Sequence, residues 1–389
     1  MIFIISIHNL RCRLLQLSPM KIILIGYCTI ILIGTLLLGL PIATRNPEDA
    51  NFFTGFFTAT SATCVTGLIQ FDTYTYWSPF GQAVILGLIQ IGGIGFMTLG
   101  IFIMVLAKVK IGLISRSLMQ NSVSAPQIGG IVKMTRFILR GTFSIELFGA
   151  ILLAIYFCPK YGLGKGIWFS IFHSISAFCN AGFDLMGTAE PFSSLTAQVG
   201  NWYVNLIIMS LIVVGGLGFF VWRDILNTRL HFAKMQLHTK LVLTVTAFLI
   251  ISGSVLLFLF EHRTASFEGL TLSEQVAAAS FQSVSARTAG FNTIDLAALT
   301  ESGRFLIIIL MFIGASPGST AGGIKTTTFA VLALSVVTTF RSRKSAEVFG
   351  RRLEEMITRK ATCIFMLYLS LSLSVSMIIA RIENIEFLD

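Results

Sequence analysis

Long apolar stretches alternate with polar loops along the whole chain. Most of the stretches are about 20 residues long, which is the length an α-helix needs to cross the ~30 Å hydrocarbon core of a bilayer. The pattern predicts an all-α polytopic membrane protein. The apolar stretches cover residues 22–40, 81–107, 137–157, 202–222, 239–260, 303–340 and 361–380.

Composition and charge agree with this prediction. The 389 residues are 54% hydrophobic and 12% charged, whereas about a quarter of the residues in soluble domains are charged. The net charge is +10, and the basic residues are concentrated in alternate loops. Of the 28 Lys and Arg residues, 20 lie in 1–21, 108–140, 223–240 and 341–360. Such a distribution places the amino terminus and the basic loops in the cytoplasm. We therefore expect membrane lipid as a partner and no nucleic acid.

The same short motif occurs in three loops on the opposite side. It reads FTATSATCVTGL at 57–68, FHSISAFCNAGF at 172–183 and FQSVSARTAGF at 281–291. Each copy has Phe, three residues, Ser-Ala, three or four residues, and then Gly. Because the copies lie 115 and 108 residues apart, the sequence predicts structural repeats of this period.

Each repeat is predicted to contain a span, a short half-helix, an extended glycine-containing segment and a second span. The half-helices, at about 50–62, 165–177 and 272–286, are too short to cross a membrane. Non-helical backbone at membrane depth occurs where it is buried in protein or lines a water-filled path. Carbonyl oxygens of such backbone can replace the hydration shell of a cation. The alternative interpretation is a set of glycine-rich extracellular turns.

We name residues 63–67, 179–182 and 287–290 the three glycine segments. Their side chains differ, which favours binding by backbone carbonyls over a metal site or a nucleophile. The segments consist of Thr63, Cys64, Val65, Thr66 and Gly67; Cys179, Asn180, Ala181 and Gly182; and Arg287, Thr288, Ala289 and Gly290.

A glycine pair follows each motif, in IGGIGF (91–96), VGGLGF (214–219) and AGGIKT (321–326). In the first two we expect close helix packing by small residues. The third lies in SPGSTAGGIKTTT, inside a stretch from Phe305 to Phe340 that would be about 54 Å long as one helix. A break is therefore predicted there, and Lys325 within it would repel cations if it faced an ion path.

Other polar residues suggest less specific roles. The six cysteines (12, 28, 64, 158, 179 and 363) lack metal-ligand spacing and suit small apolar positions in helices. We expect no resident metal and no covalent cofactor. Glu146 lies within a span, so it is either functional or part of a helix–helix hydrogen bond, and His173 suits packing or a helix hydrogen bond. Asp72, Asp184 and Asp295 follow the glycine segments and suggest a solvated mouth that attracts cations.

The motifs TATSATCVTGL, SAFCNAGF, SARTAGFNT and SPGSTAGGIKTTT resemble the Trk/Ktr/HKT superfamily of cation transporters, in particular the Ktr-type potassium-uptake membrane subunit. The resemblance implies K+-channel-like span–pore helix–span repeats with pseudo-four-fold symmetry, about 3.25 of them in this chain. It implies that the residues of the three glycine segments form the ion filter. It also implies potassium uptake across the plasma membrane, with Na+ as a candidate coupling or activating ion. It also implies a cytosolic nucleotide-binding regulatory subunit and a homodimer.

In this family 314–327 would be an intramembrane gating loop. Its predicted gate residues are Gly314, Ser316, Pro317, Gly318, Ser319, Thr320, Gly322, Gly323 and Lys325. The expected organisation is a cytoplasmic segment (1–21), repeat 1 (22–107), a linker (108–136), repeat 2 (137–222), a linker (223–238), repeat 3 (239–340), a basic linker (341–360) and the start of repeat 4 (361–389).

A fourth filter glycine is expected at about 398–405, beyond Asp389. We therefore expect the chain to be truncated before its fourth filter and not to conduct selectively as it stands. An ATP-driven pump is a weaker alternative, because Ile324 stands where a P-loop requires Lys. A coupled secondary transporter is another, although repeats of one orientation favour a central pore over inverted repeats. No residue pattern suggests an enzyme.

Overall fold

The computed structural model describes residues 19–95, 98, 131–188, 190–342, 347–349, 351–352 and 354–383. The first 18 residues with Cys12, most of the 108–136 linker and the last six residues lie outside the described part. The chain divides into two compact units, Met1–Phe192 and Ser193–Asp389. Each unit is described by itself.

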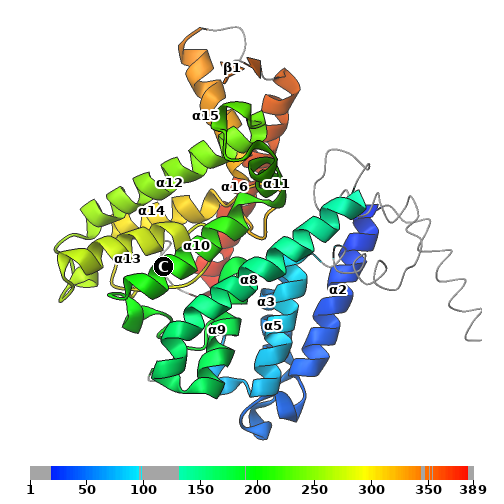
Figure 1. The fold of residues 1–389 in the computed structure, drawn as a ribbon, viewed down its shortest axis with the longest axis vertical. Coiled ribbons are helices and arrows are strands. Elements are labelled where there is room, and N and C mark those ends of the chain that lie inside the picture. The colour runs from blue at the N-terminus through cyan, green and yellow to red at the C-terminus, as the bar shows by residue number, and fades with distance from the viewer. Residues whose placement is uncertain are drawn as a thin grey trace, which may run out of the picture. The chain divides into compact units, whose positions relative to one another are not determined.

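The first unit is built from helices that pack in two groups (Figure 1). Helix α3 packs against α2 and α5, and α9 packs along α8. The helices are α2 (Pro19–Leu38), α3 (Phe52–Cys64), α4 (Thr73–Tyr76), α5 (Pro79–Ile94), α8 (Ile131–Tyr161) and α9 (Leu163–Phe178), with short 3-10 turns η1 (Pro41–Ala43) and η2 (Pro47–Asp49).

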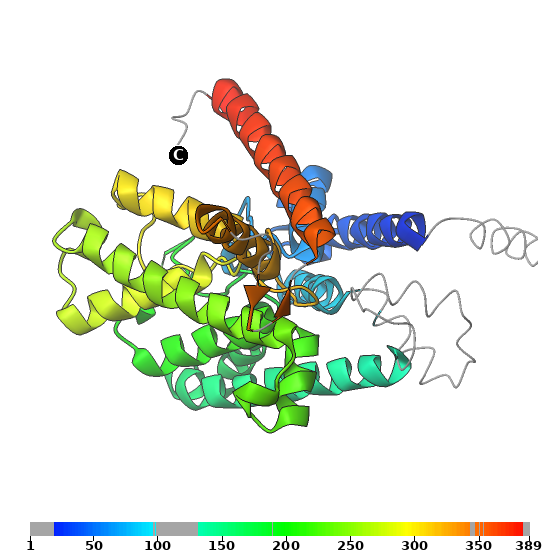
Figure 2. The ribbon, with the colours of Figure 1, turned by 90° about the horizontal axis from the view of Figure 1, so that it is seen from above.

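In the second unit, α12 packs against α13, α14 and α15 (Figures 1 and 2). Its elements are α10 (Trp202–Leu217), α11 (Phe219–Thr228), α12 (Leu237–Glu261), α13 (Leu272–Ser285), α14 (Glu301–Phe312), α15 (Thr326–Phe340), α16 (Glu355–Glu383) and a hairpin of β1 (Glu347–Val348) and β2 (Arg351–Arg352). Short 3-10 turns are η3 (Thr196–Gln198), η4 (Phe232–Lys234) and η5 (Ala265–Phe267).

Within the described residues, four helices are long and apolar enough to cross a membrane: α2, α8, α12 and α16. Large apolar side chains cover their outer faces, as with Leu147 on α8 and Phe248 on α12. Helix α16 (red in Figure 2) buries almost none of its surface within the chain. Exposed apolar faces of this kind suit lipid contact and agree with the predicted polytopic membrane protein.

Two apolar stretches that predicted single helices are interrupted at glycine. Helix α5 ends at Ile94, and Gly95 follows with φ 85°. Helices α10 and α11 meet at a bend of 94°, where Gly218 has φ 92°. The expectation of continuous helices through these stretches was therefore wrong at these two places. A left-handed residue ends an α-helix, and glycine adopts that conformation without a steric penalty.

The three predicted half-helices are present as α3, α9 and α13. Two of them, α3 and α13, begin at a side-chain cap. The Asn51 side chain accepts a hydrogen bond from the Phe53 N–H, and Thr271 and Glu274 form a capping box at the start of α13. The carboxyl end of each helix leads directly into a glycine segment. The helix dipole therefore directs partial negative charge toward each segment.

Candidate cation site

The three glycine segments share one backbone conformation. In each, the glycine and the residue two positions before it are left-handed, and the residue between them is not. Left-handed valine and threonine are uncommon, and such strain concentrates at functional sites. The φ values are 56° and 80° at Val65 and Gly67, 56° and 71° at Asn180 and Gly182, and 70° and 86° at Thr288 and Gly290.

The serine of each Ser-Ala dipeptide holds its glycine segment against the end of the half-helix. The Ser61 carbonyl accepts from the Thr66 N–H, and the Ser176 carbonyl accepts from the Ala181 N–H, both at 2.8 Å. The Ser176 hydroxyl also donates to the Phe183 carbonyl at 2.6 Å, and Ser285 makes the matching bond to Phe291. In the second and third repeats the serine therefore fixes both the start and the end of the turn. In the first repeat it fixes only the start, since the Ser61 hydroxyl bonds to none of the described residues.

In the first unit, the first and second glycine segments meet at their glycines. A β-carbon at Gly67 would lie 2.7 Å from the Ala181 carbonyl oxygen and 3.5 Å from the Gly182 Cα. Separations under 3.0 Å do not occur for real β-carbons, so no larger residue fits at position 67 without movement of the second segment. The contact brings the carbonyl-bearing backbones of two repeats together.

The first glycine pair packs against these two segments. A β-carbon at Gly93 would lie 2.6 Å from the Cys179 sulfur, and one at Gly92 would overlap the Thr63 carbonyl oxygen. Thr63 and Cys179 are the first residues of their segments. The predicted close packing of this pair is confirmed, and its partners are the glycine segments themselves.

Glu146 forms a hydrogen bond between two helices. The Gln90 side-chain amide on α5 donates to both carboxylate oxygens of Glu146 on α8, each at 3.0 Å. One carboxylate oxygen also lies 3.9 Å from the Cys179 sulfur. The helix–helix bond, one of the two alternatives left open by the sequence, is therefore present, and Glu146 contacts the second glycine segment at Cys179.

His173 makes the helix hydrogen bond expected of it and a second one. Its Nδ1 lies 2.7 Å from the Phe169 carbonyl oxygen within α9. Its Nε2 accepts from the Leu185 N–H at 3.3 Å. The ring therefore ties the chain that follows the second glycine segment back to its half-helix.

The predicted break in the 303–340 stretch is present. Helix α14 ends at Phe312 and α15 begins at Thr326. The intervening loop docks on the bend between α10 and α11: the Ser316 N–H donates to the Gly216 carbonyl at 3.1 Å, and the Phe219 N–H donates to the Gly318 carbonyl at 2.8 Å. Lys325 donates to the Ala321 carbonyl at 2.8 Å, so its ammonium group is bound within the loop.

The role of Gly218 in this docking was not predicted. A β-carbon there would lie 2.7 Å from the Pro317 carbonyl oxygen. The available signal was the third glycine of VGGLGF, two positions after the pair. IGGIGF has the same third glycine, whereas AGGIKT has Lys325 in its place.

The third glycine segment contacts the same loop through two of its side chains. The Arg287 guanidinium donates to the Gly314 carbonyl at 3.2 Å, and the Thr288 hydroxyl accepts from the Gly322 N–H at 3.3 Å. Arg287 is buried, with 6% of its surface exposed. Two predicted filter residues and two predicted gate residues are thus in direct contact.

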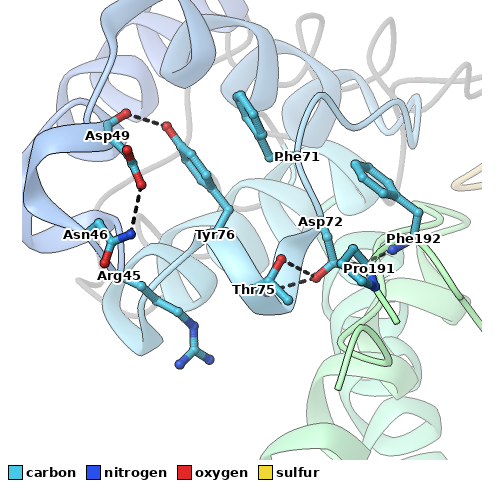
Figure 3. A pocket seen from close by; sticks show the side chains of 9 residues that line it. All are labelled: Arg45, Asn46, Asp49, Phe71, Asp72, Thr75, Tyr76, Pro191 and Phe192. Carbon is cyan, nitrogen blue, oxygen red and sulfur yellow. Dashed lines mark hydrogen bonds between the residues drawn. The ribbon is translucent and has the colours of Figure 1, made fainter. Parts of the chain in front are cut away.

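A cavity of ≈ 260 Å³ opens in the first unit beyond the first glycine segment (Figure 3). Asp72 lines it, and its carboxylate accepts from the Thr75 N–H at 2.8 Å and the Phe192 N–H at 3.0 Å. Asp72 and Asp184 are both buried. The prediction that these aspartates are solvated is therefore wrong for Asp72 and Asp184. The carboxylate of each accepts a hydrogen bond from the backbone, and Asp72 caps the start of α4. Asp295 is exposed.

Comparison with known proteins connects this geometry with a family. The family model TrkH, described as cation transport protein, matches residues 27–388. The chain belongs to the TrkH family of cation transport proteins. The potassium/sodium uptake protein NtpJ of Enterococcus hirae is 40% identical over 370 residues, which cover 95% of this chain and 81% of NtpJ.

Two further proteins extend the comparison. The Ktr system potassium uptake protein B of Bacillus subtilis is 40% identical over 362 residues, covering 92% of this chain and 80% of that protein. The crystal structure of the potassium transporter TrkH from Vibrio parahaemolyticus has a TM-score of 0.67 at 18% identity, covering 92% of this chain and 72% of that one. The predicted all-α transporter fold of the Trk/Ktr type is confirmed.

Proposed function

We propose that the chain takes up potassium across the plasma membrane and that carbonyl groups of the three glycine segments bind the ion as it passes. The observation that carries the proposal is the shared alternation of left-handed residues in the three segments. Residues of alternating hand can turn successive carbonyls toward one side, and carbonyls so arranged at the negative ends of α3, α9 and α13 are suited to a monovalent cation that has lost its water. Membership of a cation transport family supports the same function.

Potassium is the ion that we favour. Neutral carbonyls without carboxylates suit a singly charged, weakly hydrated ion better than a divalent one. Sodium is a second candidate, as transported, coupling or activating ion, because the name of NtpJ includes both ions. The 314–327 loop, docked on the α10–α11 bend, is proposed as the gate of the ion path.

The partners are proposed from the relatives. The name of the Bacillus subtilis relative describes part of a Ktr system, which favours a separate regulatory subunit for this chain. We place that subunit in the cytosol, as a nucleotide-binding protein, and we propose a homodimer of this chain surrounded by lipid. The basic loops and the amino terminus would face the cytoplasm.

Rescue of cells that lack potassium uptake tests the proposal. The chain is expressed as it stands and, in parallel, with the carboxyl-terminal part of NtpJ appended. The appended form is included because the match with this chain covers 81% of NtpJ. Each form is tested with and without a Ktr regulatory subunit, at low K+ and with Na+ present or absent. Growth in any of these conditions supports the proposal. The proposal is wrong if no form supports growth although the protein is found in the membrane.

A further inference from the structure

The two ends of the 314–327 loop are in backbone contact with each other, and we call this contact the neck of the loop. The Ile324 N–H donates to the Phe312 carbonyl at 3.1 Å, and the Ala315 N–H donates to the Gly322 carbonyl at 3.3 Å. A β-carbon at Gly314 would lie 2.7 Å from the Gly323 Cα. Residues on either side of the neck are therefore in direct backbone contact, and the rest of the loop extends beyond them.

Both sides of this neck are bound by consecutive residues of the third glycine segment. Arg287 donates to the carbonyl of Gly314, on the first side of the neck. Thr288 accepts from the N–H of Gly322, on the second side. We call these two hydrogen bonds the neck clasp. They are separate from the contacts of the loop with Gly216 and Phe219, which involve residues farther from the neck.

The position of the Thr288 hydroxyl depends on the backbone of the segment. Thr288 has φ 70°, which is an unfavourable conformation for a β-branched residue. A cation bound to the carbonyls of the segment would favour this conformation and so hold the hydroxyl opposite the Gly322 N–H. Conversely, a closed loop would hold Thr288 in the conformation that aligns its carbonyl. Coupling between two sites is reciprocal in this way.

We propose that Arg287 and Thr288 are positioning residues that clasp both sides of the loop neck, so that cation occupancy of the third glycine segment stabilises the closed loop. Because this takes the segment as a cation site, it rests on the proposed function. The clasp itself concerns only contacts within the second unit and can be tested separately.

The test uses Ser316→Cys as a reporter of loop opening. Ser316 is fully buried, so a thiol there reacts with a methanethiosulfonate reagent only when the loop opens. Modification at this position is read from the mass of its peptide, which separates it from the native cysteines. The labelling rate of Ser316→Cys is compared in the otherwise unchanged chain, called the parent, and in chains that also carry Thr288→Val, Thr288→Ser or Thr293→Val. Thr293→Val is the matched control, because Thr293 is buried and its hydroxyl bonds to none of the described residues.

Thr288→Val keeps the shape of the side chain and removes the acceptor. Loss of one such hydrogen bond should raise the labelling rate roughly two- to tenfold. Thr288→Ser, which keeps the hydroxyl, should restore the parent rate, and Thr293→Val should match the parent. Equal rates in Thr288→Val, Thr288→Ser and the parent would overturn the clasp.

Potassium dependence tests the coupling. Labelling is repeated while K+ replaces N-methylglucamine at constant ionic strength. If only the closed state binds the ion, K+ at ten times its dissociation constant should slow labelling up to about tenfold in the parent and in Thr288→Ser. Thr288→Val should lose this dependence. If Thr288→Val accelerates labelling but K+ has no effect on the parent, the coupling fails while the clasp stands, and the ion site itself is decided separately by the uptake measurements.

Discussion

Replacement of Gly92 by alanine should displace the first glycine segment. A β-carbon at this position would overlap the Thr63 carbonyl oxygen and lie 2.9 Å from the carbonyl carbon. These are backbone atoms at the start of the segment, and they cannot rotate away as a flexible side chain could. Extra carbon in a tightly packed site typically costs about 1–3 kcal/mol of the free energy of unfolding.

Gly87→Ala is the matched control on the same helix. Nothing lies within 4 Å of a β-carbon at Gly87. Both substitutions gain the helix preference of alanine over glycine, about 1 kcal/mol, so the difference between the two variants isolates the steric cost. Gly92→Ala should therefore be less stable than Gly87→Ala by about 1–3 kcal/mol.

Denaturant unfolding of both variants in detergent measures this difference, and the initial rate of K+ uptake shows whether the segment has moved. Gly92→Ala should lose uptake, and Gly87→Ala should keep it. Equal stability and equal uptake in the two variants would refute the contact between the first glycine pair and the first glycine segment.

Three further predictions concern the bend, the buried carboxylate and the capping box. Gly218→Ala places alanine at φ 92°, at a cost of about 1–2 kcal/mol, and should raise the labelling rate of a buried loop cysteine. Glu146→Leu leaves the Gln90 amide without its acceptor and should lower the free energy of unfolding by about 1–3 kcal/mol, whereas Glu146→Gln should cost less. Hydrogen bonds from the Thr271 backbone N–H and hydroxyl lower the pKa of Glu274 below its usual 4.5. That contribution to stability is therefore present above pH 4.5 and is lost as the pH falls through the lowered pKa. Thr271→Ala should weaken this acid dependence in unfolding measurements at several pH values.

The half-helices and the loop were predictable because their signals are local. The Ser-Ala…Gly motif indicates a helix end and a turn within about a dozen residues, and three copies of it are not expected by chance. The length of the 303–340 stretch required a break. Asp72 also carries a local signal, that of a helix cap. It directly precedes a short helix, and its side chain accepts from the Thr75 N–H three positions later.

Contacts between distant residues were not predictable in the same way. Gly92 meets Thr63, and Gly93 meets Cys179, so the partners lie 29 and 86 residues apart with no shared pattern. A glycine pair in an apolar stretch predicts close packing without naming the partner. Arg287 is a similar case. Its place in the third motif predicted a filter residue, but only the fold brings its guanidinium to Gly314.

The central claim, that the glycine segments bind the transported ion, is tested most directly by comparing Gly67→Ala with Gly162→Ala. The two glycines have φ values of 80° and 83°, so alanine should introduce similar backbone strain at both. Nothing lies within 4 Å of a β-carbon at Gly162, whereas one at Gly67 would meet the Ala181 carbonyl. The initial rate of K+ uptake is measured in the form of the chain that supports growth. Gly162→Ala should retain uptake and Gly67→Ala should lose it. Equal uptake by the two variants would contradict the account.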